Sequence, residues 1–262
     1  MIESTKNPTV KRVARLKQRP EREETGLALM EGPQVVRELI AHAAASVEEL
    51  YLTSDGFARH PELAEAATAA GIEVELVADA VLAAMADTRT PQGVLAVAHQ
   101  TPTRLKDAIP PGTRLVAVLD EVRDPGNAGT VIRAADAAGA DVVILTGSSV
   151  DPYNPKVVRA TTGSLFHLAV VTGVTLEAAA AAVRGAGLSL LAADMHGEPL
   201  PDTDLTGPTA WLFGNEAHGL SDSARALADR TVAVPIYGAA ESLNLGTAAA
   251  VCLYATAFAH RP

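Results

Sequence analysis

WLFGNEAHGLSD, residues 211–222, and VPIYGAAESLNLGTAAAVCLYA, residues 234–255, are the most informative stretches of this chain. In the first, an apolar strand pattern ends at Gly214. In the second, a strand ends at Pro235, and Ser242, Leu243 and Asn244 then open an apolar helix. Strand ends with free backbone amides, next to a helix N-terminus, form a pocket for a flat ligand with polar edges. We therefore expect the chemistry of this protein here.

Strand and helix patterns alternate along the whole sequence. The second half holds apolar runs, which are nearly continuous and are separated by helical patterns, at 115–119, 142–145, 168–171, 188–193, 209–213 and 231–234. Such runs are typical of parallel strands covered on both faces, so this part predicts an α/β fold with a wound parallel sheet.

The first hundred residues predict a smaller α/β sandwich. Strands are expected at 26–31, 49–52, 73–77 and 93–98, and helices near 8–18, 34–43, 61–70 and 79–86. Residues 101–112 contain three prolines and no sustained periodicity, which indicates a linker. The predicted domains are residues 1–103 and 113–262, joined by the linker 104–112.

The composition is that of a soluble globular protein. The 262 residues are 48% hydrophobic and 20% charged, and no apolar run is long enough to cross a bilayer. The N-terminus shows no secretory signal, and the single cysteine, Cys252, lies in an apolar helix pattern. These features predict a cytoplasmic protein with no membrane partner and no internal disulfide.

The charge is distributed unevenly. The formal net charge is −10, yet residues 1–22 hold seven basic and only two acidic residues. A basic segment on an acidic body favours a polyanion bound at one end, although a solvated surface helix gives the same pattern.

A third informative stretch, residues 119–145, begins where a strand ends at Asp120. A Pro125-Gly126 turn follows, and Asn127 is expected to cap a helix beginning near Ala128. Arg133 projects away from the apolar stripe of this helix, at the edge where open α/β sheets bind ligands. The alternative is a surface arginine that pairs with Asp136 or Asp120.

Several site classes lack their sequence patterns. There is no dinucleotide G-x-G-x-x-G fingerprint, no phosphate-binding G-x-x-x-x-G-K-[ST] loop and no G-x-S-x-G nucleophile motif. The seven histidines are scattered without ligand spacing and have no partner cysteines, so we expect no metal site. Gly214 allows a positive φ and close ligand approach, and Glu216 offers an acceptor, although a plain turn fits both. Ser242 and Asn244 have a similar alternative, in which they only cap the helix that follows.

Taken in order, these segments resemble the three motifs of SpoU-type (TrmH-like) RNA 2'-O-ribose methyltransferases of the SPOUT superfamily. The matching positions are Asn127-x-Gly129-x-x-x-Arg133, then Phe213-Gly214-Asn215-Glu216, then Ser242-Leu243-Asn244. The first hundred residues are similar to the substrate-binding domain that often precedes this catalytic domain. The matching pieces are Asn7-Pro8 with Lys11, Glu31-Gly32 before a helix, and Asp87-Thr88 with Thr90-Pro91-Gln92-Gly93. One departure from the family pattern is Leu245-Gly246-Thr247. Its glycine is unexpected inside a helix, where glycine costs about 1 kcal/mol relative to alanine.

The resemblance implies a C-terminal trefoil knot, a homodimer and S-adenosylmethionine as cofactor. It places the cofactor mainly against backbone groups at Leu191, Ala192, Leu212, Gly214, Val234, Leu243 and Leu245. Arg133 is expected to contact the ribose 2'-oxygen and the RNA phosphate, while Ser242 and Asn244 orient these groups and Asn127 and Glu216 hold the loops. The expected phosphate contacts are Lys6, Lys11, Arg12, Arg15 and Lys17.

The two-domain layout favours ribosomal RNA over transfer RNA as the substrate. A non-catalytic RNA-binding protein on the same scaffold is the other alternative. The nucleotide that is methylated, and any link to antibiotic resistance, stay open.

Overall fold

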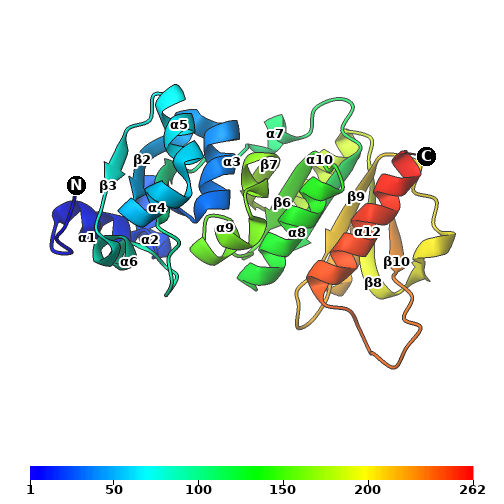
Figure 1. The fold of residues 1–262 in the computed structure, drawn as a ribbon. Helices are drawn as coiled ribbons and strands as arrows, with labels where there is room; N and C mark the ends of the chain where they lie inside the picture. The colour runs from blue at the N-terminus through cyan, green and yellow to red at the C-terminus, as the bar shows by residue number, and fades with distance from the viewer. Residues whose placement is uncertain (262) are drawn as a thin grey trace. The chain divides into compact units, whose positions relative to one another are not determined.

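The computed structural model describes residues 1–261, which divide into two compact units (Figure 1). The first unit comprises Met1–Thr101 together with Asp151–His167, and the second comprises the other described residues. Each unit has its own sheet. None of the helices in residues 1–261 combines the length and the hydropathy needed to cross a membrane.

The first unit is built on a four-stranded mixed sheet with the order β1-β4-β2-β3. Both β1 and β2 run antiparallel to the central β4, whereas β3 is parallel to β2. The predicted strands are all present, as β1 (Leu27–Glu31), β2 (Val47–Leu52), β3 (Val74–Leu76) and β4 (Val94–His99).

Helices cover both faces of this sheet. On one face, α1 (Pro8–Arg15) packs with α6 (Asp79–Met85) in a core cluster that includes Val10, Val13 and Leu16. The basic helix is therefore part of the core. It ends at Arg15 instead of residue 18, because a separate helix, α2 (Arg19–Thr25), follows with Pro20 in its first turn. The periodicity did not predict α2. The other helices before residue 101 are α3 (Pro33–Ala43), η1 (Ala44–Ser46), α4 (Ser54–Arg59) and α5 (Pro61–Ala69).

The segment Asp151–His167 supplies α9 (Pro155–Thr161) and η2 (Ser164–Phe166) to the first unit. Its anchor is a buried ion pair: Nη2 of Arg22, a side chain only 1% exposed, lies 2.6 Å from Oδ2 of Asp151. Nη1 of Arg22 donates to the carbonyl oxygens of Leu16 and Lys17. The buried guanidinium is thus neutralised and hydrogen-bonded, as an interior charge must be.

The second unit holds a six-stranded sheet with the order β10-β8-β9-β5-β6-β7, in which every neighbouring pair is parallel. This confirms the predicted wound parallel sheet. The strands are β5 (Leu115–Asp120), β6 (Val142–Thr146), β7 (Ala169–Val174), β8 (Ser189–Pro199), β9 (Thr209–Phe213) and β10 (Arg230–Ala233).

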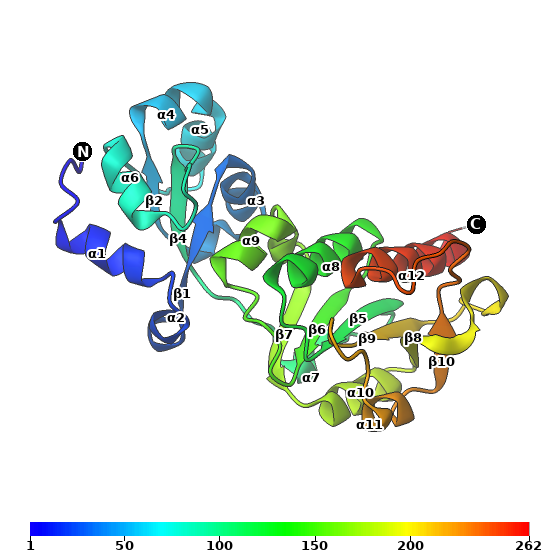
Figure 2. The same ribbon diagram turned by 90° about the horizontal axis from the view of Figure 1, so that it is seen from below.

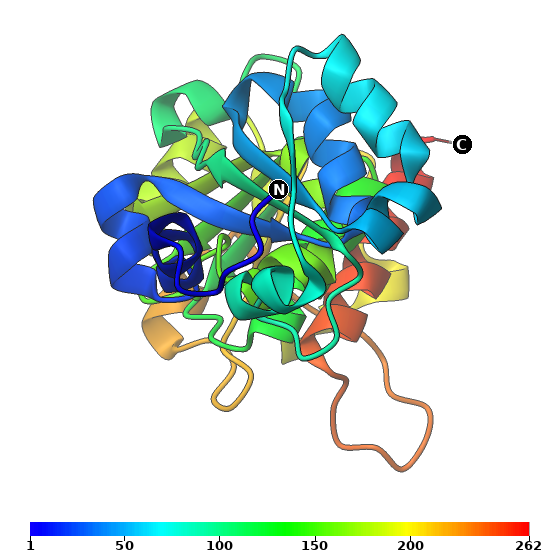
Figure 3. The ribbon, with the colours of Figure 1, turned by 60° about the vertical axis from the view of Figure 1, so that its left-hand side comes forward.

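Two long helices, α8 (Pro125–Ala137) and α12 (Leu245–His260), lie side by side on one face of this sheet (Figure 2). The opposite face is covered by α7 (Leu105–Ala108), α10 (Leu176–Gly185) and α11 (Asp222–Ala226). The remaining short helix is η3 (Leu200–Asp202). Residues 234–244, between β10 and α12, form a long open loop (Figure 3).

Candidate active site

The candidate site lies at the carboxyl ends of β5 and β9. These neighbouring parallel strands end at Asp120 and Phe213. The chain continues from β5 to β6 on one side, whereas β9 and β8 lie on the other. The strand order therefore reverses between β5 and β9, which is where open α/β sheets form a ligand crevice.

The first motif begins α8, but not as predicted. The N-cap is Asp124, whose Oδ1 accepts a 2.8 Å hydrogen bond from the Asn127 backbone N–H, and Pro125 starts the helix. Proline favours this position because its fixed φ suits the first helical turn. The prediction that Asn127 caps the helix was wrong. Its side chain instead forms hydrogen bonds to the other two motifs.

Asn127 joins the other two motifs. Its Nδ2 donates a 3.3 Å hydrogen bond to Oε1 of Glu216, and its Oδ1 accepts a 2.9 Å hydrogen bond from Nδ2 of Asn244. Glu216 also accepts from the backbone N–H groups of Arg123 and Asp124. These hydrogen bonds therefore connect side chains from three segments that are distant in sequence.

Gly214 follows β9 and is needed for packing within the second motif. Its φ does not fall in the left-handed region, so the positive φ that a glycine allows is not adopted here. A Cβ at Gly214 would lie 2.5 Å from the carbonyl carbon of Gly219 and 2.6 Å from the backbone nitrogen of Leu220. The glycine thus allows the loop 215–219 to fold back tightly, closed by hydrogen bonds between the Asn215 and Gly219 backbones.

The third motif ends at Asn244, the N-cap of α12, whose Oδ1 accepts from the Thr247 backbone N–H. The unusual Gly246 has a clear packing reason. A Cβ there would lie 2.7 Å from Cγ2 of Thr130 on α8, so the glycine lets the two helices approach closely. The backbone groups of residues 234–243 make no hydrogen bond to other backbone groups among residues 1–261.

Arg133 lies on α8 and is exposed, away from the buried face of the helix, as predicted from the apolar stripe. Among the described residues it forms no hydrogen bond or ion pair, and Asp120, one suggested partner, bonds to Thr146 instead. Within residues 1–261, no hydrogen bond or ion pair joins Arg133 or Ser242 to the connected group of Asn127, Glu216 and Asn244.

The predicted cofactor positions occupy neighbouring strands and the loops that follow. Ala192 on β8 pairs in register with Leu212 on β9, and Leu191 pairs with Trp211. The sequence predicted that β8 ends at residue 193, which is wrong, because β8 continues to Pro199 alongside β10. Its pairing with β9 nevertheless stops at Ala192. Beyond the strands, Val234 follows β10, Leu243 is exposed, and Leu245 begins α12.

A cavity of about 500 Å³ opens at the same end of the sheet, next to α10 and α11. Its lining includes Asp120, Glu121 and Glu177, and none of the predicted cofactor positions. Burial raises the pKa of Asp120. Hydrogen bonds from Ser148, with a smaller effect of Arg123, lower the pKa of Glu121 to about 2. Sequence reasoning did not single out Glu121, although it is an acid placed directly after a predicted strand.

The predicted phosphate contacts of the first unit differ in availability. Lys6 and Lys11 are exposed. Arg12 and Arg15 pair with Glu49 and Glu21, and Lys17 donates from Nζ to the carbonyl oxygens of Ala84 and Ala86. Within residues 1–261, the side chains of Lys6 and Lys11 form no hydrogen bond or ion pair, so these two lysines can meet a polyanion without losing such a bond.

Family comparisons agree with this geometry. Residues 114–254 match the SpoU rRNA Methylase family, and residues 7–96 match the MRM3-like substrate binding domain. The chain belongs to the SpoU rRNA methylase family. This SpoU methylase is 35% identical to the 23S rRNA (guanosine(2553)-2'-O)-methyltransferase RlmP of Bacillus subtilis, over 97% of both chains.

Solved structures resemble this SpoU methylase over nearly its whole length. The AdoMet-bound rRNA methyltransferase from Sinorhizobium meliloti has a TM-score of 0.85 and 31% identity, and covers 97% of this chain and 96% of its own. The SpoU methyltransferase AviRb from Streptomyces viridochromogenes, in complex with AdoMet, has a TM-score of 0.82 and 33% identity, covering 96% of this chain and 98% of its own.

Proposed function

We propose that this SpoU methylase transfers a methyl group from S-adenosylmethionine to a ribose 2'-hydroxyl of ribosomal RNA. The observation that carries the proposal is the position of Asn127, which bonds to both Glu216 and Asn244. All three family motifs thereby meet at one edge of the sheet. RlmP, which matches over nearly the whole chain, is named as a 23S rRNA 2'-O-methyltransferase, and the SpoU methyltransferase AviRb was solved in complex with AdoMet.

The residues beside this edge suit the cofactor. Main-chain groups of residues 234–243 have no backbone partner among the described residues, and they follow β10 directly. Free N–H and C=O groups can bind the edge of an adenine ring, which needs donors and acceptors in fixed places. Leu212 and Leu243 would add apolar contacts. When bound, S-adenosylmethionine supplies an electrophilic methyl group.

Arg133 is assigned the stabilisation of the attacking oxygen. A guanidinium stays protonated in proteins, so it does not act as a literal base. It can instead stabilise the negative charge that develops on the 2'-oxygen, while the proton leaves to phosphate or water. The exposed and unpaired state of Arg133 among residues 1–261 leaves its donors available. Ser242 and Asn244 would orient the hydroxyl, with Asn127 and Glu216 holding the loops.

We propose that the protein is a homodimer that pairs through α12. Val251, Tyr254 and Phe258 form an exposed apolar stripe along this helix, with Phe258 69% exposed. The Tyr254 and Phe258 rings contact each other, at a centroid distance of 5.6 Å. Contiguous exposed apolar side chains of this kind mark interaction sites.

The SpoU resemblance also leads us to propose a trefoil knot in the segment that contains β10 and α12. The insertion of β8 between β9 and β10 is consistent with it. We place the protein in the cytoplasm, where ribosomal RNA is available. The first unit would hold the RNA, with the exposed Lys6 and Lys11 among its phosphate contacts.

The test is direct mapping of 2'-O-methylation. Purified protein is incubated with radiolabelled S-adenosylmethionine and with ribosomal or transfer RNA from cells that lack the gene, and the modified ribose is located by alkaline-hydrolysis sequencing. The proposal predicts one protected ribose in ribosomal RNA. Cofactor binding without methyl transfer to either RNA would favour the non-catalytic alternative, and methyl transfer to transfer RNA alone would overturn the substrate.

A further inference from the structure

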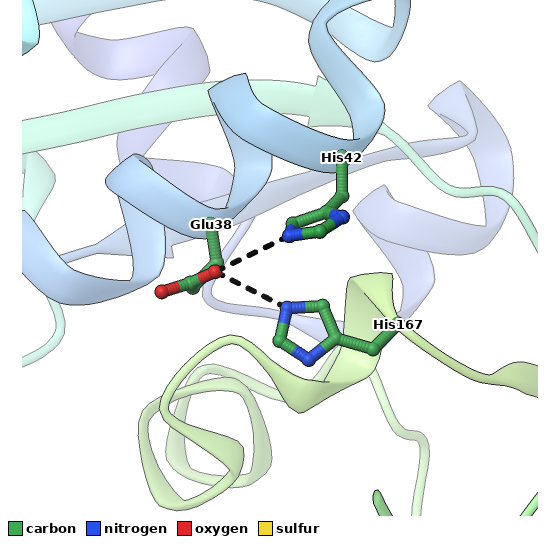
Figure 4. A group of neighbouring side chains, drawn as sticks. All are labelled: Glu38, His42 and His167. Atoms are coloured by element: carbon green, nitrogen blue, oxygen red, sulfur yellow. Dashed lines mark hydrogen bonds and ion pairs between the residues drawn. The ribbon is translucent and has the colours of Figure 1, made fainter.

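Two histidines that are far apart in sequence meet a glutamate in the first unit (Figure 4). Glu38 and His42 lie one turn apart on α3, and His167 directly follows η2. Oε2 of Glu38 lies 3.6 Å from Nε2 of His42 and 3.2 Å from Nε2 of His167. The two imidazole rings are 4.4 Å apart between centroids in an edge-to-face arrangement.

The carboxylate of this group is held in place by its surroundings. Its other oxygen, Oε1, accepts a 2.7 Å hydrogen bond from Nε2 of Gln34, one turn earlier on α3. The backbone of Gly163 packs directly on its stem, since a Cβ there would lie 2.3 Å from Cγ of Glu38. The Glu38 oxygen that faces both imidazoles is therefore oriented by outer contacts, as ligands in metal sites commonly are.

We propose that Glu38, His42 and His167 bind a divalent first-row transition ion of the zinc class. Two imidazoles and one carboxylate are the donors that zinc accepts. In a tetrahedral zinc site, bond lengths near 2.0–2.2 Å put ligand atoms roughly 3.4 Å apart. The two distances to Glu38 fall on either side of this value, and all the candidate donor atoms lie within 4.8 Å of one another.

The three side chains are part-exposed, at 22%, 49% and 26% for Glu38, His42 and His167, which leaves room for water as a fourth ligand. The scattered histidines predicted no metal site. Sequence spacing does not show that α3 and the segment Asp151–His167 belong to one unit. The ion would tie this segment to α3 at one end, as the Arg22–Asp151 ion pair ties it at the other.

The experiment uses the full-length protein after removal of metals with EDTA. Zinc chloride is titrated by calorimetry, with magnesium chloride as a hard-cation probe, and Co²⁺ is added separately to record its visible spectrum. His42→Gln and His167→Gln are compared with the control His99→Gln. His99 is an exposed histidine in the same unit that lies 3.1 Å from Glu48, but among residues 1–261 these two belong to no such three-residue group.

The proposal predicts one equivalent of zinc, no magnesium binding and an intense cobalt spectrum. Loss of a direct ligand should weaken zinc binding by at least about tenfold in each of the two variants, because outer contacts alone account for factors of that size. His99→Gln should bind zinc normally. Hydrogen exchange in residues 151–167 should slow when zinc is added.

Three results would overturn the site: no zinc binding by the unmodified protein, the weak cobalt spectrum of the hydrated ion, or full affinity in both histidine variants. The first two are measured on the unmodified chain, so they hold even where a variant folds poorly. A fourth result, magnesium binding with an affinity equal to that for zinc, would contradict the choice of a zinc-class ion.

Discussion

Asn244 donates a 2.9 Å hydrogen bond from its Nδ2 to Oδ1 of Asn127, a residue 117 positions earlier in the chain. Each asparagine stands at the start of a helix, α12 or α8, and these helices pack on the same face of the sheet. The bond therefore fixes the two helix starts relative to each other, at the edge of the sheet where Glu216 also bonds to Asn127.

Arg133→Ala should abolish most methyl transfer while leaving S-adenosylmethionine binding intact. Removing one donor that stabilises developing negative charge lowers kcat by about 10²–10³. Single-turnover methylation and calorimetry measure the two effects separately. The matched control is Arg104→Ala, an exposed arginine of the same unit that pairs with Asp107. An unchanged rate in Arg133→Ala would remove the arginine from the mechanism.

Gly246→Ala should destabilise the second unit despite the better helix propensity of alanine. The added methyl group would meet Thr130 Cγ2 at 2.7 Å, and overpacking of this kind costs about 1–3 kcal/mol. Urea unfolding measures the change. Thr130→Ala in the same chain should restore part of the stability, whereas Gly185→Ala, with open space around its Cβ position, should cost nothing. A fully stable Gly246→Ala protein would show that the helices can separate freely.

Phe258→Glu should convert the proposed dimer into monomers. It places a charge in the middle of an apolar contact, where an unpaired carboxylate cannot be solvated. Sedimentation velocity gives the mass of the particle. Phe57→Glu makes the same change at an exposed phenylalanine of the first unit and should leave the dimer intact. If the unmodified protein already sediments as a monomer, the dimer proposal fails.

Lys6→Glu with Lys11→Glu should weaken RNA binding and flatten its salt dependence. Each lost phosphate contact lowers the slope of log affinity against log salt by about one. Filter binding at several salt concentrations provides the slope, and Lys106→Glu, an exposed lysine of the second unit, makes the same type of charge change elsewhere. An unaltered slope would place RNA capture on another surface.

Glu121 should contribute a pH-dependent part of the stability. Its folded pKa is lowered to about 2 from an ordinary 4.5, chiefly by the Ser148 hydrogen bonds. A lowered pKa favours folding above the unfolded value, so this contribution is present above about pH 4.5 and is lost as the pH falls toward 2. Ser148→Ala should raise the pKa of Glu121 and so reduce the loss of folding stability on acidification. Urea midpoints at neutral and acid pH test this, and identical pH profiles for the two proteins would contradict it.

Periodicity predicted the two sheets well because each strand of the second unit is a short apolar run bounded by turn residues. It failed in two ways. Pro20 and Pro125 lie in the first turns of α2 and α8, and the bounds of α1 and α8 differ from the predicted ones by a few residues because periodicity alone does not include this local proline effect. The extension of β8 to Pro199 follows from its pairing with β10, which no local pattern shows.

The site was predictable in its residues but not in its contacts. Motif order brought out Asn127, Glu216 and Asn244 together, whereas the bridging role of Asn127 depends on Asp124 capping α8 in its place. The grouping of Glu38, His42 and His167 has no counterpart in sequence spacing, because it arises from the folding of a distant segment onto α3.

The buried Arg22–Asp151 pair has a consequence for exchanging parts between related enzymes. A chimera that takes only residues 1–101 from one parent would bring a buried guanidinium into contact with a foreign loop. Unless that loop supplies a carboxylate at the position of Asp151, an interior positive charge is left uncompensated. Successful recombination of RNA specificity within the family should therefore transplant Asp151–His167 together with the amino-terminal hundred residues.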